Sequence, residues 1–219
     1  MVLKQYKIIF LDFDGVVLES ADIKNQAFKK MFEALVPEKI NEIMEYLEIN
    51  SGLSRYVKFN YVYSKYLGKK LNESEMKKLG NEFSALCLEG VQKAPFVPGA
   101  HEFLEKYSKK TKLFIASGSP NLELKETVTI RGLDKYFNGV FGAPKKKSEV
   151  VNEVLAKLKT PKHETVFVGD SMTDYEEAGK AGVPFIGRLS TKTSPFPKGT
   201  KIVNDLYGLD DVLSSKTGE

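Results

Sequence analysis

Two aspartates follow an apolar run near the start of the chain, and their spacing indicates metal chemistry. Asp12 and Asp14 come directly after Ile8-Ile9-Phe10-Leu11, and Gly15 follows them. An unbroken apolar run of this length is typical of a parallel strand covered on both faces. If the chain turns at Gly15, both carboxylates reach one cleft, where charges about 4 Å apart repel by about 4 kcal/mol at an effective dielectric of about 20. A divalent cation with oxygen ligands would turn this repulsion into binding. The alternative is that the pair merely ends a strand and caps the next segment.

A second apolar run ends in small polar residues that could bind an anion. Leu113-Phe114-Ile115-Ala116 leads into Ser117-Gly118-Ser119-Pro120. A turn of this kind at the start of a helix presents backbone N–H groups and a hydroxyl to a group such as phosphate. Ser119 before Pro120 could equally be an ordinary helix cap.

A third apolar run, Thr165-Val166-Phe167-Val168, is followed by Gly169-Asp170-Ser171-Met172-Thr173-Asp174. The spacing of Thr173 and Glu176 predicts a capping box that starts a helix there. Asp174 would then lie in the first helical turn, near Asp170 in the preceding loop. Asp174 could also complement the helix dipole, whereas Asp170 has no such explanation.

Three consecutive lysines, Lys145, Lys146 and Lys147, precede Ser148, which we interpret as the cap of another amphipathic helix. We expect two of these lysines to be solvated. A lysine at a helix start beside an anion site could neutralise phosphate and carboxylate together.

The ordered set of these motifs, at residues 8–15, 113–119, 145–147 and 165–174, resembles the haloacid dehalogenase superfamily over almost the whole chain. The resemblance implies that Asp12 is a nucleophile that forms an aspartyl-phosphate. It also implies that Asp14 donates a proton to the leaving alcohol and later takes one from water. Mg²⁺ would be held by Asp12, Asp170 and the backbone carbonyl of Asp14, with Asp174 as an indirect or water-mediated partner.

The resemblance also assigns phosphate ligands. Ser117 and the N–H groups around Gly15 and Gly118 would hold the phosphoryl oxygens. Lys147 is our choice for the neutralising cation because it directly precedes the helix. Many relatives carry Lys-Pro-x-Pro at this motif and this chain does not, so Lys145 is the alternative.

The hydrophobic pattern divides the chain into a core and an insert. After Gly15 come four stretches with helical periodicity, and after Pro95-Phe96-Val97-Pro98-Gly99 strands alternate with helices. Alternation of this kind predicts a doubly wound parallel α/β sheet, the Rossmann-like core of the superfamily, with its motifs at the carboxyl ends of the strands. We expect the core to span residues 1–15 and 96–219, and residues 16–95 to form an all-helical cap domain over the site.

Three functions compete. The first is a magnesium-dependent phosphatase that hydrolyses a phosphomonoester of a small metabolite. The second is a mutase similar to the β-phosphoglucomutases, because Gly52-Leu53-Ser54-Arg55 resembles the stretch with which those enzymes grip a second phosphate. Those mutases usually have a Glu-Asp pair where this chain has Asp170-Ser171.

Arg55 and Lys58, if they face the site, would imply a substrate with a second anionic group. Arg55 could equally be a surface residue at a helix start. The third is a non-catalytic metal- and phosphate-binding protein, and dehalogenation is disfavoured because dehalogenases generally lack the second aspartate.

Composition limits the remaining alternatives. The 219 residues are 42% hydrophobic and 28% charged, with a net charge of +4 and one cysteine, Cys87. These values are typical of a globular protein from a reducing compartment, and we expect it to be cytoplasmic. Basic and acidic residues are interspersed, so we expect no nucleic acid as a partner, and no apolar run is long enough for a membrane span. The expected partner is a small phosphorylated metabolite, and the oligomeric state stays open.

Overall fold

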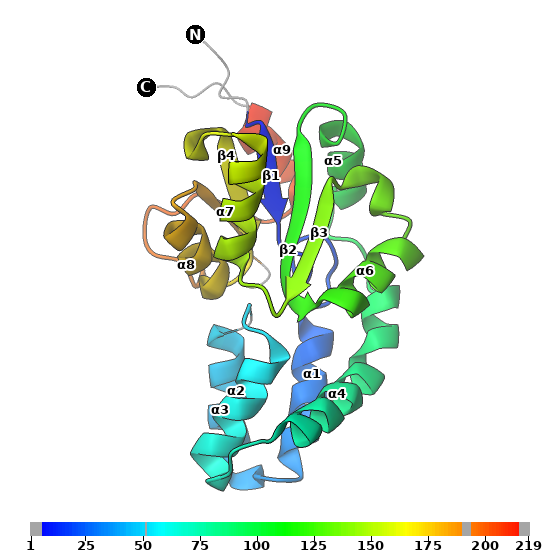
Figure 1. Cartoon of the computed structure of the whole chain (residues 1–219), viewed down its shortest axis with the longest axis vertical. Coiled ribbons are helices and arrows are strands. Elements are labelled where there is room, and N and C mark those ends of the chain that lie inside the picture. Colours follow the sequence, from blue (N-terminus) through cyan, green and yellow to red (C-terminus); the bar gives the residue numbers. More distant parts are fainter. Residues whose placement is uncertain (1–5, 51, 190–193, 215–219) are drawn as a thin grey trace.

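The computed structural model describes residues 6–50, 52–189 and 194–214. Residues 1–5, 190–193 and 215–219 of the expected core, and Ser51 of the expected cap, lie outside the described residues. Figure 1 shows an α/β part above and a purely helical part below, joined by the segments around residues 16–20 and 94–97.

A parallel six-stranded sheet in the order β3-β2-β1-β4-β5-β6 forms the α/β part. The strands are β1 (Ile8–Leu11), β2 (Lys112–Pro120), β3 (Gly139–Ala143), β4 (Thr165–Gly169), β5 (Phe185–Arg188) and β6 (Ile202–Val203). All adjacent strands pair in parallel. This order is that of a doubly wound sheet, whose direction of winding reverses between β1 and β4 and leaves a crevice for ligands at the carboxyl ends there. The predicted fold class is confirmed.

Strand β1 is buried on both faces because its alternate side chains enter two separate hydrophobic clusters. Ile9 and Leu11 pack in the first cluster, with helices α5 (Ala100–Tyr107), α6 (Asn121–Ile130) and α9 (Leu206–Ser214). Ile8 and Phe10 pack in the second, with α7 (Lys147–Leu158) and α8 (Met172–Ala181). The unbroken apolar run in the sequence is the consequence of this two-sided burial.

The helical part contains α1 (Ala21–Glu33), the short 3₁₀ helix η1 (Pro37–Lys39), α2 (Ile40–Ile49), α3 (Arg55–Leu67) and α4 (Glu73–Lys93). Two further 3₁₀ helices, η2 (Asp134–Tyr136) and η3 (Lys162–Glu164), lie in the α/β part. Helices α1–α4 bury a third hydrophobic cluster of their own, rich in phenylalanine. Among the described residues, no helix has the length and apolar character required to cross a bilayer.

The two connecting segments run side by side and are hydrogen-bonded to each other. Glu19 N–H donates to the carbonyl of Pro95 at 2.9 Å, and Val97 N–H donates to that of Val17 at 3.0 Å. Arg188, at the end of β5, donates to the Glu19 carboxylate at 2.9 Å and to the Gly15 carbonyl at 3.1 Å. These contacts anchor the paired segments to the sheet. The division into a core and a cap at residues 15 and 96 stays a prediction.

Three local predictions are wrong. The capping box at the start of α8 joins Ser171 and Asp174, so Thr173 lies inside the first turn. Helix α7 begins at Lys147, before Ser148, whose N–H and hydroxyl both donate to Glu177. Strand β2 continues through Pro120, so α6 begins only at Asn121. In each case a polar contact or a strand pairing that residue spacing does not specify shifts the start of the helix by one or two residues from its predicted position.

In the helical part, truncation of a buried leucine should destabilise the protein, whereas truncation of an exposed leucine should not. Leu47 is completely buried in this cluster, whereas Leu35 is 49% exposed. Leu47→Ala should lower the free energy of unfolding by about 2–5 kcal/mol because it leaves a cavity. Leu35→Ala, with identical chemistry, should change it by about 0.5 kcal/mol or less. Denaturant unfolding followed by circular dichroism measures both, and equal effects would contradict the packing described here.

Candidate active site

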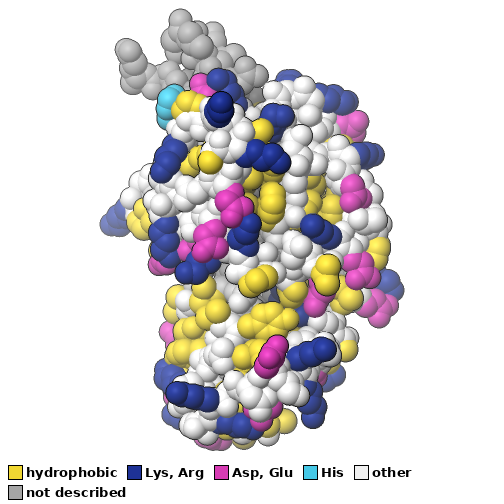
Figure 2. All heavy atoms as spheres, viewed as in Figure 1, with side chains coloured by type: hydrophobic (Ala, Val, Ile, Leu, Met, Phe, Trp, Pro, Cys, Tyr) yellow, Lys and Arg dark blue, Asp and Glu magenta, His cyan; other side chains and the backbone are white. Residues whose placement is uncertain are grey.

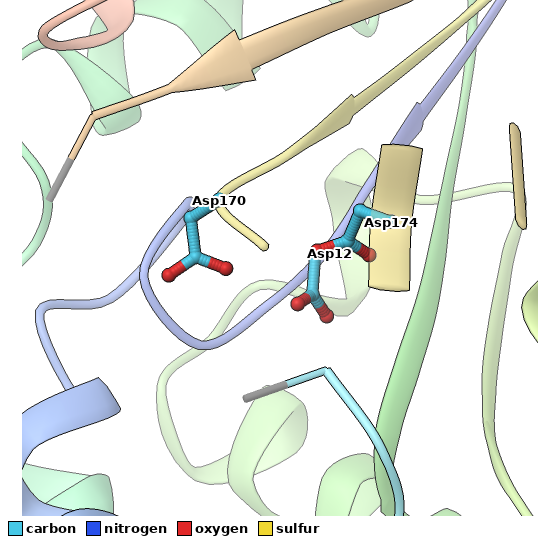
Figure 3. Close-up of side chains that lie close together, drawn as sticks. All are labelled: Asp12, Asp170 and Asp174. Carbon is cyan, nitrogen blue, oxygen red and sulfur yellow. The ribbon is translucent and has the colours of Figure 1, made fainter. Parts of the chain in front are cut away.

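Three carboxylates meet at the carboxyl end of the sheet, where β1 and β4 lie next to each other. Asp12 follows β1, Asp170 follows β4, and Asp174 is in the first turn of α8. Leu11 is in register with Val168, and Asp12 N–H donates to the Val168 carbonyl at 2.9 Å. One oxygen from each of the three carboxylates lies within 4.8 Å of the others (Figure 3). Parallel pairing of the strands therefore brings together residues that are far apart in the sequence.

A buried lysine neutralises part of this charge. Lys147 Nζ lies 3.0 Å from Asp12 Oδ2 and also donates to Asp174 Oδ1. Burial alone would lower the pKa of Lys147, but the charges of Asp12 and Asp174 outweigh it and raise that pKa above its ordinary value. Lys145 is exposed instead and pairs with Glu153 at 2.6 Å. The geometry thus places Lys147, and not Lys145, beside the carboxylates.

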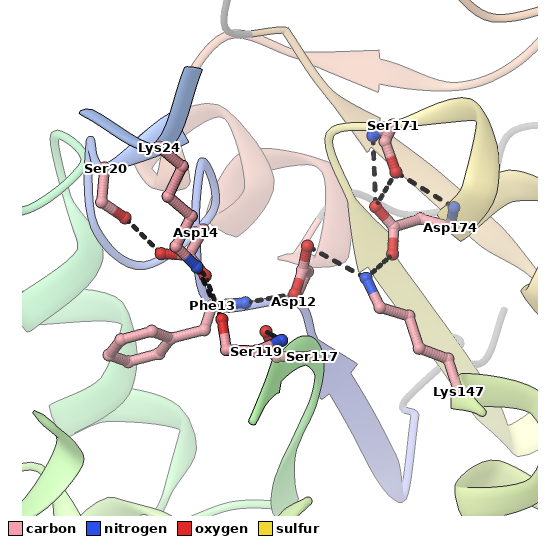
Figure 4. A network of polar contacts seen from close by, with 10 residues as sticks. All are labelled: Asp12, Phe13, Asp14, Ser20, Lys24, Ser117, Ser119, Lys147, Ser171 and Asp174. Carbon is pink, nitrogen blue, oxygen red and sulfur yellow. Dashed lines mark hydrogen bonds and ion pairs between the residues drawn. The ribbon is translucent and has the colours of Figure 1, made fainter. Parts of the chain in front are cut away.

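Asp174 is held rigidly by the start of its own helix. Its Oδ2 accepts hydrogen bonds from the Ser171 hydroxyl at 2.6 Å and from the Ser171 N–H at 3.2 Å, while Oδ1 accepts from Lys147 (Figure 4). Both oxygens of this fully buried carboxylate are therefore engaged. The arrangement fits an indirect role in which Asp174 positions Lys147.

Asp12 and Asp170 are the carboxylates that could hold a cation. Burial raises the pKa of Asp12, although Lys147 opposes the effect. Burial and the charges of Asp12 and Asp174 raise the pKa of Asp170 well above its usual range. Three carboxylates against one ammonium leave an excess of negative charge in this cluster when all three are ionised. A set of oxygen donors with excess negative charge suits a hard divalent cation such as Mg²⁺.

Gly15 allows Asp170 to approach the turn that follows Asp12. The φ angle of Gly15 is +79°, in the left-handed region, and a Cβ there would lie 2.0 Å from Asp170 Oδ2. A side chain at this position would therefore be strained and would also displace the carboxylate. The Gly15 N–H itself donates to the Leu18 carbonyl at 2.7 Å, so it is not available to phosphate. A role in phosphate binding for the N–H groups around it stays a prediction.

Asp14 belongs to a separate network. Its carboxylate accepts hydrogen bonds from the Ser20 hydroxyl at 2.6 Å and the Ser119 hydroxyl at 2.9 Å, and it is ion-paired with Lys24 (Figure 4). Although burial opposes the effect, the Lys24 charge and these hydrogen bonds hold the pKa of Asp14 below its ordinary value. The Asp14 side chain is thus directed at Lys24 and is not one of the three clustered carboxylates, so only its backbone carbonyl could serve the metal as expected.

Sequence reasoning did not identify Ser20, Lys24 and Ser119 as site residues. Ser20 is the N-cap of α1 and Lys24 lies one turn further along, but this spacing does not indicate that either residue faces Asp14. Ser119 was interpreted as a possible helix cap, whereas its hydroxyl links Lys24, at 2.6 Å, to Asp14.

A cavity between the sheet and the helical part connects the two networks. Its lining includes most of the predicted site residues, namely Asp12, Asp14, Ser117, Gly118, Asp170, Arg55 and Lys58. Ser117 is buried, and its hydroxyl accepts a hydrogen bond from Ser119 N–H at 3.2 Å. The other predicted residues, Gly15, Lys147 and Asp174, lie behind this lining, in contact with Asp170 or Asp12.

The loop before α3 closes over the phosphate-binding turn that we expect at Ser117 and Gly118. A Cβ on Gly118 would lie 2.7 Å from the Gly52 carbonyl oxygen, and a Cβ on Gly52 would lie 2.4 Å from Ser171 Oγ. Glycine at both positions therefore permits the helical part to sit directly on the sheet edge. The helical part and the sheet edge are therefore in contact at this turn.

Both predicted cap residues of the site are buried cations. Lys58 is 4% exposed, and its ammonium lies 5.1 Å from the centre of the Phe28 ring. Burial, with the nearby Lys24 charge, lowers the pKa of Lys58 to about 7. Arg55 is 6% exposed and forms an ion pair with Glu123, a residue of α6 that sequence reasoning missed.

Comparison with known proteins identifies the family. Residues 8–188 match the model of the haloacid dehalogenase-like hydrolases, and the chain belongs to that family. A phosphorylated carbohydrates phosphatase from Thermotoga maritima is 28% identical over 197 residues, which cover 80% of this chain and 81% of that protein. The predicted superfamily is confirmed, and the comparisons support the predicted phosphatase enzyme.

Solved structures share the fold at low identity. CbbY from Rhodobacter sphaeroides, in complex with phosphate, is 19% identical, with a TM-score of 0.71 over 94% of this chain and all (100%) of that chain. A predicted phosphoglycolate phosphatase from Haemophilus somnus is 19% identical, with a TM-score of 0.72 over 95% of this chain and 98% of that one. At this identity the likeness establishes the fold alone.

The position of Lys147 predicts a large effect on stability in metal-free buffer. Lys147→Met should lower the free energy of unfolding by about 3–5 kcal/mol, because it leaves buried carboxylates without their cation. Lys145→Met removes an exposed pair and should cost about 1 kcal/mol or less. Chemical denaturation with a chelator present measures the two variants. If Lys145→Met lost more unfolding free energy than Lys147→Met, the assignment of Lys147 as the buried cation of the site would be wrong.

Proposed function

We propose that the protein is a magnesium-dependent phosphatase that hydrolyses a phosphomonoester of a small metabolite through an aspartyl-phosphate on Asp12. The observation that carries this proposal is the position of Asp12, which lines the cavity beside the Lys147 ammonium and the Asp170 carboxylate. The phosphatase from Thermotoga maritima, named for phosphorylated carbohydrates, supports a phosphorylated carbohydrate as the substrate.

In the first half-reaction, an oxygen of Asp12 attacks phosphorus, and the bond from phosphorus to the ester oxygen breaks. Lys147 keeps Asp12 ionised and offsets the negative charge of the phosphoryl group. The Ser117 hydroxyl and the N–H groups around Gly118 hold the phosphoryl oxygens. Mg²⁺, held by Asp12, Asp170 and the Asp14 carbonyl, would supply further charge neutralisation when bound.

Asp14 acts as the general acid and then as the general base. It protonates the departing alkoxide in the first half-reaction, and in the second it takes a proton from the water that attacks phosphorus and releases Asp12. The contact with Lys24 favours the carboxylate, which is the form required in the second half-reaction. Donation in the first half therefore requires Lys24 to release Asp14 while it keeps its hydrogen bond to the Ser119 hydroxyl.

A panel of phosphorylated metabolites tests the proposed activity. With Mg²⁺ the protein should release inorganic phosphate from at least one sugar phosphate, and a chelator should abolish the release because Asp12 and Asp170 then repel the substrate. Colorimetric phosphate assays measure both. Formation of glucose 6-phosphate from β-glucose 1-phosphate, without phosphate release, would identify a mutase instead, and no turnover of any compound would favour a non-catalytic binding protein.

Replacement of Asp14 by Asn should slow turnover by about 10²–10⁴, the usual effect of losing general acid–base assistance. The leaving group of 4-nitrophenyl phosphate needs no proton. With this substrate Asp14→Asn should still give a burst of nitrophenol, because only hydrolysis of the aspartyl-phosphate on Asp12 is slowed. Stopped-flow absorbance measures the burst. Asp22→Asn, an exposed aspartate in α1, is the control. Undiminished turnover in Asp14→Asn would remove the proton-transfer role.

A further inference from the structure

We infer that Glu123 determines substrate specificity: by neutralising Arg55, it fits the leaving-group end of the cavity to a neutral, hydroxyl-bearing group and excludes a second anion. This inference rests on the proposed function. It names the substrate class as monophosphorylated sugars or polyols, and it makes bisphosphates and phosphorylated carboxylic acids poor substrates.

The ion pair between Arg55 and Glu123 is bidentate. Arg55 Nη1 lies 3.1 Å from Glu123 Oε1, and Arg55 Nη2 lies 2.6 Å from Glu123 Oε2. The Ser84 hydroxyl donates to the same Glu123 Oε1 at 2.6 Å. Arg55 is also fixed by the Phe83 ring, whose centre lies 4.5 Å from its guanidinium carbon. A planar guanidinium with parallel bonds to one carboxylate is among the stronger charge-assisted pairs.

The pair joins α3 of the helical part to α6 of the α/β part, close to Asp14. Arg55 lines the main cavity together with Asp12 and Ser117. Arg55 and Glu123 also line an adjoining cavity with Asp14 and Ser119. A phosphoryl group on Asp12 would therefore direct its leaving group past Asp14 toward Arg55 and Glu123.

The charges at this end discriminate between substrates. A second phosphate or a carboxylate that reached Arg55 would either lie beside the Glu123 carboxylate or displace it, leaving a half-buried charge without its partner. A hydroxyl group can instead donate to Glu123 and accept from Arg55 while the pair stays intact. The arginine that the sequence indicates as a ligand for a second anion is thus neutralised by a residue of α6.

Two pairs of substrates test the inference, and the members of each pair differ in whether the leaving group carries only neutral hydroxyls or a second anion. They are sn-glycerol 3-phosphate against 3-phosphoglycerate, and glucose 1-phosphate against glucose 1,6-bisphosphate. The wild-type protein should show a higher kcat/KM for the member of each pair whose leaving group is uncharged, namely sn-glycerol 3-phosphate and glucose 1-phosphate. Glu123→Gln should shift the ratio toward the anionic member by about tenfold or more, because Arg55 is then uncompensated. Glu126→Gln, an exposed glutamate one turn further along α6, should leave the ratio unchanged.

If Glu123 had only a structural role, its replacement would change kcat/KM for both substrates of a pair equally and leave their ratio at the wild-type value. Glu123→Asp, which keeps the charge, should retain the wild-type preference. Arg55→Gln should shift the ratio in the opposite direction, because Glu123 then repels anions, and this variant serves if Glu123→Gln fails to fold. An unchanged ratio in both, or a wild-type preference for the anionic members, would overturn the inference alone. Phosphate release from no phosphomonoester would overturn the proposed function with it.

Discussion

The structure depends on a concentration of negative charge that the fold itself creates. A parallel strand buried on both faces has room for polar side chains only at its ends, and the pairing of β1 with β4 brings two such ends together. Asp12, Asp170 and Asp174 therefore meet with Lys147 as their compensating cation. The remaining negative charge would repel a phosphate group, and in the proposed function a metal ion offsets it.

Two ion pairs join the helical part to the α/β part beside the site. Lys24, on α1, binds Asp14, and Arg55, on α3, binds Glu123, so each cation is matched by a carboxylate from the α/β part. Glycines at positions 52 and 118 allow the backbones of the two parts to touch. A hydroxyl group can bind beside the intact pair of Arg55 and Glu123, whereas an anion must displace Glu123. We infer that the cost of this displacement decides which leaving groups are accepted.

The sequence predicted what periodicity and strand order determine: the doubly wound sheet, the helical insert, and the meeting of Asp12 with Asp170. It left Lys145 and Lys147 as alternatives, since only the path of the backbone before α7 separates a buried from an exposed lysine. The contacts of Lys24 and Glu123 could not be predicted, because spacing does not specify how α1 and α3 pack on the sheet edge. Strand β3 was missed because it is a short edge strand with two glycines.

Isothermal titration calorimetry with Mg²⁺ tests the central claim most directly, because it requires neither a substrate nor an assumed reaction. The wild-type protein should bind one Mg²⁺ per chain, and Asp170→Asn should lose this binding while Glu153→Gln, which changes only an exposed pair with Lys145, should retain it. Equal binding of Mg²⁺ by wild type and Asp170→Asn, or no binding by either, would contradict the account.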